Sequence, residues 1–218
     1  MSKLDDLIKQ YCPQGVEYLP LGNICTFKRG KSLSKDVKGL GSIPIILYGE
    51  LYTNYGNYIT DIVSRTSLEI ALKATPATKN DIIMPITSTT KEAQIGKASA
   101  LCVSETVYIG GDAMILSHEQ NAGYLVYLLN SSYFEKLKMQ YRSGITVSHL
   151  SPKGIASIKV PVPPLPVQEE IVRILDKYTE LEKELEQKLQ EEIDIRKKQY
   201  EYYRNKLVIF SPKIKEGN

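Results

Sequence analysis

The chain has 218 residues, of which 42% are hydrophobic, and its 28 basic and 25 acidic residues give a net charge of +3. This length allows one domain of about 165 residues and a further helical segment. The sequence shows neither a signal peptide nor a run of about 18 apolar residues, so we expect a cytoplasmic protein that does not enter a membrane. Cys12, Cys25 and Cys102 are widely spaced, and the histidines are His118 and His149. This pattern argues against a disulfide framework or a zinc site, and we expect no metal.

Short apolar runs bounded by turn residues predict a mixed fold in which strands dominate. We expect a helix at 4–11 and then strands at 18–30, 42–48, 80–85, 95–102 and 112–117. Helices at 121–129 and 132–140 precede a last strand at 156–161. Pro44 lacks a backbone N–H, which predicts an edge or first position for its strand. The expected fold class is α+β, a mixed α/β domain.

Four prolines mark a junction, and a long helix is predicted directly after it. Pro161, Pro163, Pro164 and Pro166 fix φ and disfavour helix in the residues before them. Glycine and proline are absent from 167–210, where Glu, Lys, Leu and Gln abound, which predicts a helix of roughly 40 residues and about 60 Å. The predicted organisation is a domain at 1–160, the junction at 161–166, the helix at 167–210 and a tail at 211–218.

The predicted helix carries an apolar stripe that must be buried against something. Its members recur at steps of three, four or seven, which places them on one face: Ile171, Leu175, Tyr178, Leu181, Leu185, Leu189, Ile193, Tyr200, Tyr203 and Leu207. Consecutive steps of four depart from a strict heptad and predict a locally straightened coil. We expect a partner helix on this stripe; packing of the helix along its own domain is the alternative.

The excess of positive charge belongs to the predicted domain. Residues 1–166 hold 17 basic and 13 acidic residues, whereas 167–210 hold 9 and 11. The basic residues fall mostly where loops are expected, which is typical of a surface that meets nucleic acid, although a solvated mixed surface has a similar composition.

The order of segments resembles the specificity subunit of type I restriction-modification systems, with one target recognition domain and one conserved spacer helix. Nearly the whole chain contributes, through LPLGNI at 19–24, Arg29-Gly30, SIPII at 42–46, NDII at 80–83, GYLVYLLNSSYF at 123–134, SGIT at 143–146 and IKVPVPPLPVQEEIV at 158–172. The last of these segments is the most specific. Members of the family usually carry two recognition domains and two antiparallel helices in one chain, so the resemblance implies a half-size subunit.

The resemblance implies sequence-specific recognition of double-stranded DNA, with adenine-N6 methylation and restriction performed by partner subunits. The implied partners are methyltransferase subunits that use S-adenosylmethionine, and restriction subunits that need ATP and Mg²⁺. A second copy of the chain, held through antiparallel helices, would give twofold symmetry and an interrupted palindromic site. Three alternatives stay open: a truncated or silent cassette, a coiled-coil scaffold that does not bind DNA, and a detached recognition domain of another modification or defence system.

Motifs for catalysis within the chain fail on inspection. Lys31-Ser32 after Gly30 imitates the end of a phosphate-binding loop, but Cys25 stands where that motif needs glycine. The segment at 162–165 is not the Asn-Pro-Pro-aromatic motif of an adenine methyltransferase, and no glycine-rich cofactor loop is present. We therefore expect no catalytic residue and no cofactor bound by this chain.

Four polar segments, at 28–35, 52–58, 87–94 and 140–149, have the composition of DNA-contacting loops. Lys and Arg neutralise phosphates, whereas Arg, Asn, Gln, Ser and Thr exchange hydrogen bonds with base edges. Solvated loops would look similar. The candidate DNA-binding residues are Lys28, Arg29, Lys31, Ser32, Lys35, Tyr52, Asn54, Tyr55, Asn57, Thr89, Thr90, Lys91, Gln94, Tyr141, Arg142, Ser143, Thr146 and His149.

Overall fold

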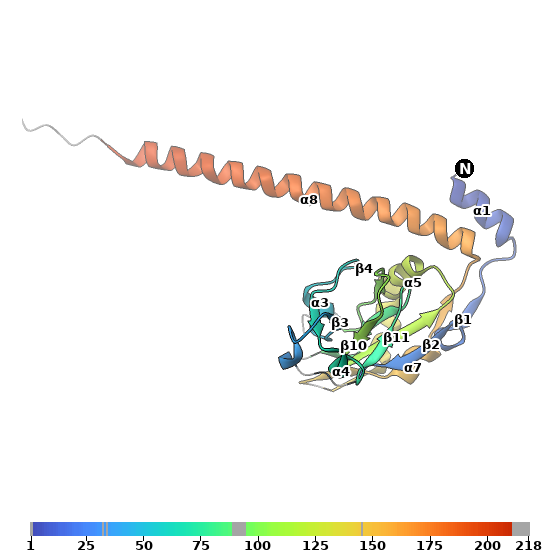
Figure 1. Cartoon of the computed structure of the whole chain (residues 1–218). Coiled ribbons are helices and arrows are strands. Elements are labelled where there is room, and N and C mark those ends of the chain that lie inside the picture. The colour runs from blue at the N-terminus through green and yellow to red at the C-terminus, as the bar shows by residue number, and fades with distance from the viewer. Residues whose placement is uncertain (1, 32, 34, 89–94, 145, 211–218) are drawn as a thin grey trace, which may run out of the picture. The chain divides into compact units, whose positions relative to one another are not determined.

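The computed structural model describes residues 2–31, 33, 35–88, 95–144 and 146–210, and the chain divides into two units after Val172. The first unit holds all strands and the short helices, and the second holds most of the long helix α8 (Leu165–Val208) (Figure 1). The expected α+β class is confirmed. The long helix begins two residues before the predicted start and has 44 residues.

A five-stranded sheet lies at the centre of the first unit. Its strands follow the order β2-β11-β7-β9-β4 and all neighbours are antiparallel except β4 and β9. The bounds are β2 (Cys25–Arg29), β4 (Tyr58–Ile59), β7 (Ile82–Pro85), β9 (Ser99–Leu101) and β11 (Ala113–His118). Side chains alternate between two apolar clusters, with Ile82 and Met84 in one and Ile83 in the other. The sheet is thus buried on both faces.

A four-stranded sheet covers one of these faces, in the order β5-β3-β10-β6. Its strands are β3 (Ile43–Ile46), β5 (Ser64–Thr66), β6 (Thr75–Ala77) and β10 (Val107–Ile109). The edge position predicted from Pro44 is wrong, because β3 lies between β5 and β10. Pro44 is the second residue of β3 and pairs with Arg65 of β5, and pairing with β10 starts only at Ile45. The connections here include η1 (Lys35–Val37), α3 (Glu50–Thr53) and α4 (Leu68–Ala71).

Helices cover the other face of the central sheet. Polar caps start three of them, with Asn121, Ser131 and Ser151 each accepting a backbone hydrogen bond from three residues ahead. The helices are α5 (Ala122–Leu129), α6 (Ser132–Lys138), η2 (Met139–Tyr141) and α7 (Pro152–Ser157). Phe134 of α6 is fully buried in the cluster between the helices and the sheet. The expected helices at 121–129 and 132–140 are confirmed within two residues.

Two predicted strands are interrupted by helix. The segment at 18–30 forms β1 (Tyr18–Pro20), then α2 (Leu21–Ile24), and only then β2. The last predicted strand is shortened to β14 (Lys159–Pro161), because the Ser151 cap and Pro152 in the first turn start α7 instead. Strand β14 pairs with β1, so the start of the domain is tied to the segment that enters the long helix.

The first turns of α8 are fastened to the rest of the first unit by buried polar side chains. Gln168 is fully buried; its amide donates to Gln120 Oε1 at 2.8 Å and to the Pro163 carbonyl at 2.7 Å, and it accepts from the Asn121 N–H at 3.0 Å. Glu170 pairs with Lys3 of α1 (Lys3–Tyr11) at 2.8 Å. These contacts hold the first turn of α8 within the first unit.

Candidate nucleic-acid interface

A small sheet brings the third and fourth polar segments together. Its order is β12-β13-β8, with bounds β8 (Thr87–Ser88), β12 (Arg142–Ser143) and β13 (Ser148–Leu150). His149 is paired with Thr87 on one side and with Ser143 on the other. These strands have only two or three residues, which is too short for hydrophobic periodicity to reveal them.

Antiparallel pairing brings the first segment to the same place. Strand β11 lies between β2 and β7 and is antiparallel to both. The end of β2, the start of β11 and the end of β7 therefore lie at the same end of the central sheet. Arg29 is the last residue of β2, Asp112 precedes β11, and Thr87 follows β7 by two residues. Three residues that are far apart in the chain therefore meet.

Thr87 is the centre of the resulting polar network. Its hydroxyl donates to Asp112 Oδ1 at 3.1 Å and lies 3.1 Å from His149 Nδ1. Its carbonyl accepts from the Tyr52 hydroxyl at 2.8 Å. Arg29 Nη2 lies 3.5 Å from the same Asp112 oxygen. Each of the four polar segments thus contributes to one network.

The Tyr52 hydroxyl is a stable donor in this network. Burial raises the pKa of Tyr52 to about 12, which keeps the phenol protonated at neutral pH. Tyr52 therefore ties its segment to β8 instead of offering a charged oxygen.

Arg142 lies on the opposite face of the small sheet from His149, because neighbouring strand residues alternate. Its Nε and Nη2 donate to the Ser148 hydroxyl at 2.9 and 2.6 Å, and the guanidinium remains exposed. The fourth segment thus presents one cation on one face and one imidazole on the other.

The remaining predicted residues fall into three groups. Lys28, Lys31, Asn54, Ser143 and Thr146 are exposed, and the backbone of Lys35 lies in η1. Asn57 and Tyr141 are half-buried: Asn57 accepts from the Asn130 amide at 3.3 Å, and Tyr141 packs against the helical side of the core. Outside the described residues lie Ser32, Thr89, Thr90, Lys91 and Gln94.

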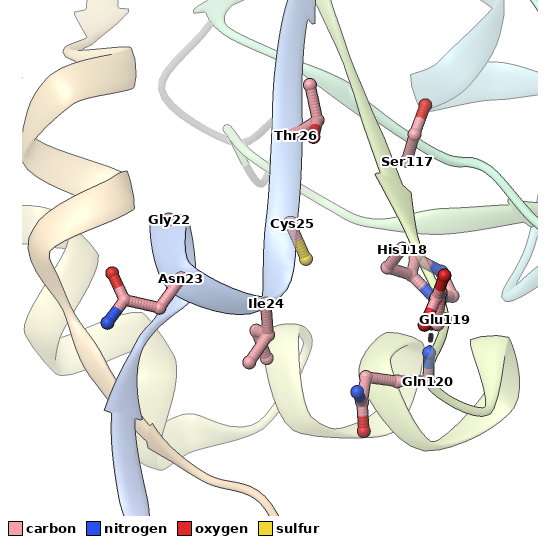
Figure 2. A pocket seen from close by; sticks show the side chains of 9 residues that line it. All are labelled: Gly22, Asn23, Ile24, Cys25, Thr26, Ser117, His118, Glu119 and Gln120. Carbon is pink, nitrogen blue, oxygen red and sulfur yellow. Dashed lines mark hydrogen bonds between the residues drawn. The ribbon is translucent and has the colours of Figure 1, made fainter.

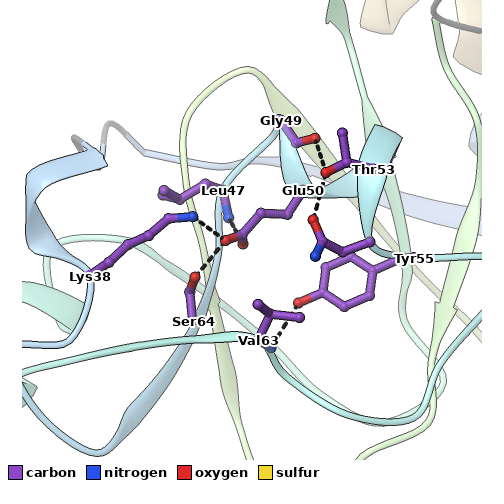
Figure 3. Close-up of polar contacts among 9 residues, drawn as sticks. Lys38, Leu47, Gly49, Glu50, Thr53, Tyr55, Val63 and Ser64 are labelled. Atoms are coloured by element: carbon purple, nitrogen blue, oxygen red, sulfur yellow. Dashed lines mark hydrogen bonds and ion pairs between the residues drawn. The ribbon is translucent and has the colours of Figure 1, made fainter.

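Tyr55 is a core residue, which corrects its predicted role. It is 7% exposed, packs in the cluster between the two large sheets, and accepts a hydrogen bond from the Val63 N–H at 3.2 Å. Figure 3 shows its ring beside Glu50, whose buried carboxylate accepts from Lys38 Nζ, the Leu47 N–H and the Ser64 hydroxyl. A ring enclosed in this way cannot stack on a base.

Sequence reasoning missed Asp112, which connects two of the segments. The residue has φ of 61°, the left-handed region that aspartate tolerates better than most residues. The signal that was available is the turn composition of Gly110-Gly111-Asp112 directly before an apolar strand.

Comparison with known proteins shows the family. A model described as the type I restriction modification DNA specificity domain matches residues 13–194. The chain belongs to this family. The specificity subunit of the EcoR124I/EcoR124II type I restriction enzyme from Escherichia coli is 30% identical over 202 residues, which cover 89% of this chain and 48% of the relative. The chain thus spans about half the length of this relative.

Solved structures share the fold. One, titled as the assembly and conformational transition of the type I R-M system, matches with a TM-score of 0.64 at 19% identity, over 91% of this chain and 48% of that one. The HsdS subunit from Thermoanaerobacter tengcongensis matches with a TM-score of 0.56 at 17% identity, over 82% and 42%.

The specificity domain also has a pocket of about 540 Å³ away from the network residues. It lies between 22–26 and 117–120 (Figure 2). His118 lines it: Nδ1 accepts from the Gln120 N–H at 3.1 Å, and Nε2 is buried with no hydrogen-bond partner among the described residues. Within the described part of the chain, no three His, Cys, Asp or Glu side chains are grouped to hold a metal ion. No helix there is long and apolar enough to cross a membrane.

The environment of His118 predicts acid sensitivity of the fold. Burial lowers the pKa of His118 below its usual 6.5, so at mildly acidic pH the unfolded chain binds a proton that the folded chain does not. The contribution of His118 to the free energy of unfolding should therefore be fully present above about pH 6.5. It should be lost as the pH falls from there through the lower pKa that His118 has in the folded state. Urea unfolding at pH 7.5 and 5.0 should show a larger loss for the wild type than for His118→Gln. Equal losses would contradict this account.

Proposed function

We propose that this chain supplies sequence-specific DNA recognition to a type I restriction-modification complex. The observation that carries the proposal is that all four polar segments contribute to one network around Thr87 and Asp112, in a chain of the DNA specificity family. The target recognition domain would be 1–160 and the helix at 167–210 the spacer. The proposed role needs DNA contacts and no catalysis by this chain.

The exposed side chains around the network fit a DNA surface. Lys28, Arg29 and Lys31 at the end of β2 would neutralise phosphates and set the register on the duplex. Asn54 and His149 offer an amide and an imidazole for base edges. Arg142, on the other face of the small sheet, would contact a phosphate or a guanine.

The partners proposed are the methyltransferase and restriction subunits of such a system. Adenine-N6 methylation would use S-adenosylmethionine held by the former, and cleavage would use ATP and Mg²⁺ held by the latter. The relative from Escherichia coli is named as the specificity subunit of a restriction enzyme, which supports this assignment. A complex that acts on bacterial DNA would work in the cytoplasm.

We also propose that two copies associate through α8. Between Tyr178 and Leu207 the stripe is exposed, with Leu185 at 67% and Leu189 at 59%. Ile171 was predicted to belong to this interface, but it packs against the apolar cluster of the first unit, so we do not include it in the proposed seam. An antiparallel pair of these helices would relate two recognition domains by a twofold axis and give an interrupted palindromic site.

Salt dependence of DNA binding tests the recognition role. Duplex binding should weaken steeply with salt, and Arg29→Ala or Arg142→Ala should each reduce the slope of log K against log salt by about 1. Lys188→Ala, on the long helix, is the control and should leave the slope unchanged. Fluorescence anisotropy with a labelled duplex measures all four proteins. A wild type without a salt slope would refute DNA binding as the function.

The association of two copies can be tested separately. Leu185→Glu together with Leu189→Glu should convert a two-chain particle to one of 24.5 kDa, because charges in an apolar seam are strongly destabilising. Gln187→Glu with Gln190→Glu adds the same charge beside the stripe and should leave the mass unchanged. Sedimentation gives the mass, and circular dichroism checks the fold. If both double variants keep the wild-type mass, the seam is misplaced.

A further inference from the structure

The hydrogen bonds around Thr87 determine which nitrogen of His149 carries the proton. The Thr87 hydroxyl has one hydrogen, and an ionised carboxylate can only accept. Thr87 therefore donates to Asp112 Oδ1, as the 3.1 Å contact shows. Towards His149 Nδ1, also at 3.1 Å, the hydroxyl oxygen must then accept. The neutral ring consequently carries its proton on Nδ1.

A proton on Nδ1 leaves a lone pair on Nε2. His149 is exposed at the middle of the small sheet, between Thr87 and Ser143. Among the residues that the structure describes, Nε2 has no hydrogen-bond partner. The domain thus displays a fixed hydrogen-bond acceptor in the network that also includes Arg29.

His118 holds the opposite tautomer and provides a comparison within the same chain. Its Nδ1 accepts from the Gln120 N–H, so the neutral ring carries its proton on Nε2. Only the ring that faces the polar network has Nε2 available as an acceptor.

We propose that His149 is a specificity-determining residue whose Nε2 accepts a hydrogen bond from the exocyclic amino group of adenine or cytosine in the major groove. The amino groups N6 of adenine and N4 of cytosine are the donors there, whereas guanine O6 and N7 and thymine O4 would face the lone pair unfavourably. Asp112 and Thr87 act as positioning residues, because they hold the ring in this tautomer. The inference rests on the proposed function.

The tautomer is tested without DNA. Long-range ¹H–¹⁵N spectra of the full chain at alkaline pH, where imidazoles are neutral, should show one ring of each tautomer, assigned with His118→Gln. Thr87→Val removes the hydroxyl and should release His149 to a mixture, whereas Thr87→Ser should keep the Nδ1–H form. An Nε2–H ring for wild-type His149 overturns the inference, even if the valine variant fails to fold.

The base contact is tested once the preferred site has been selected from a random duplex pool. The position to alter is the one in the selected site where His149→Ala no longer prefers one base. There adenine is replaced by purine, or cytosine by pyrimidin-2-one, which removes the amino group. Wild-type affinity should fall about tenfold, since one hydrogen bond is lost and a polar atom is left unpaired, and His149→Ala should not respond. Amino-group removal at another selected position is the control and should affect both proteins equally.

Two outcomes separate this inference from the proposed function. Suppose that the wild type binds the selected site but the affinity losses from His149→Ala and from amino-group removal simply add. His149 then does not read an amino group. The same conclusion follows if His149→Ala abolishes only the loss caused by removing a guanine or thymine oxygen. If no duplex is selected at all, the proposed function fails, and the reading role of His149 fails with it. The ring spectra would still report whether the tautomer was assigned correctly.

Discussion

The arrangement of the domain depends on a central sheet that is buried on both faces. Strands β7 and β11 alternate side chains between two apolar clusters, so a shift of either strand by one residue would exchange the side chains of the two layers and disrupt the packing of both. This register places Arg29, Asp112 and Thr87 at the same end of the central sheet. The polar network is thus a consequence of core packing.

The first turn of the long helix is held within the first unit by polar contacts. The buried Gln168 side chain makes three hydrogen bonds there, and Lys3 neutralises the buried carboxylate of Glu170. Buried polar groups of this kind are costly unless every partner is present, so they permit few alternative geometries.

Much of this organisation could be predicted from the sequence, because the strongest signals are local. The proline junction, the long helix, and the helices capped by Asn121 and Ser131 all follow from composition and capping. The candidate segments were also identified, but not their meeting point. The two-residue strand β8 has no period to detect, and Tyr55 has the composition of a DNA-contacting loop while its ring fills a core. Contacts made by tertiary pairing, such as Thr87 with Asp112, have no counterpart in local sequence.

The central claim is that this chain chooses the DNA site on behalf of partner enzymes. The most direct measurement is to co-express it with the methyltransferase subunits of a type I system from its own source and to map methylated adenines across the genome. The account predicts methylation at both ends of one interrupted palindrome, and none when the chain is omitted. An asymmetric site would contradict the twofold arrangement. Methylation that is absent, or unchanged without the chain, would contradict the recognition role itself.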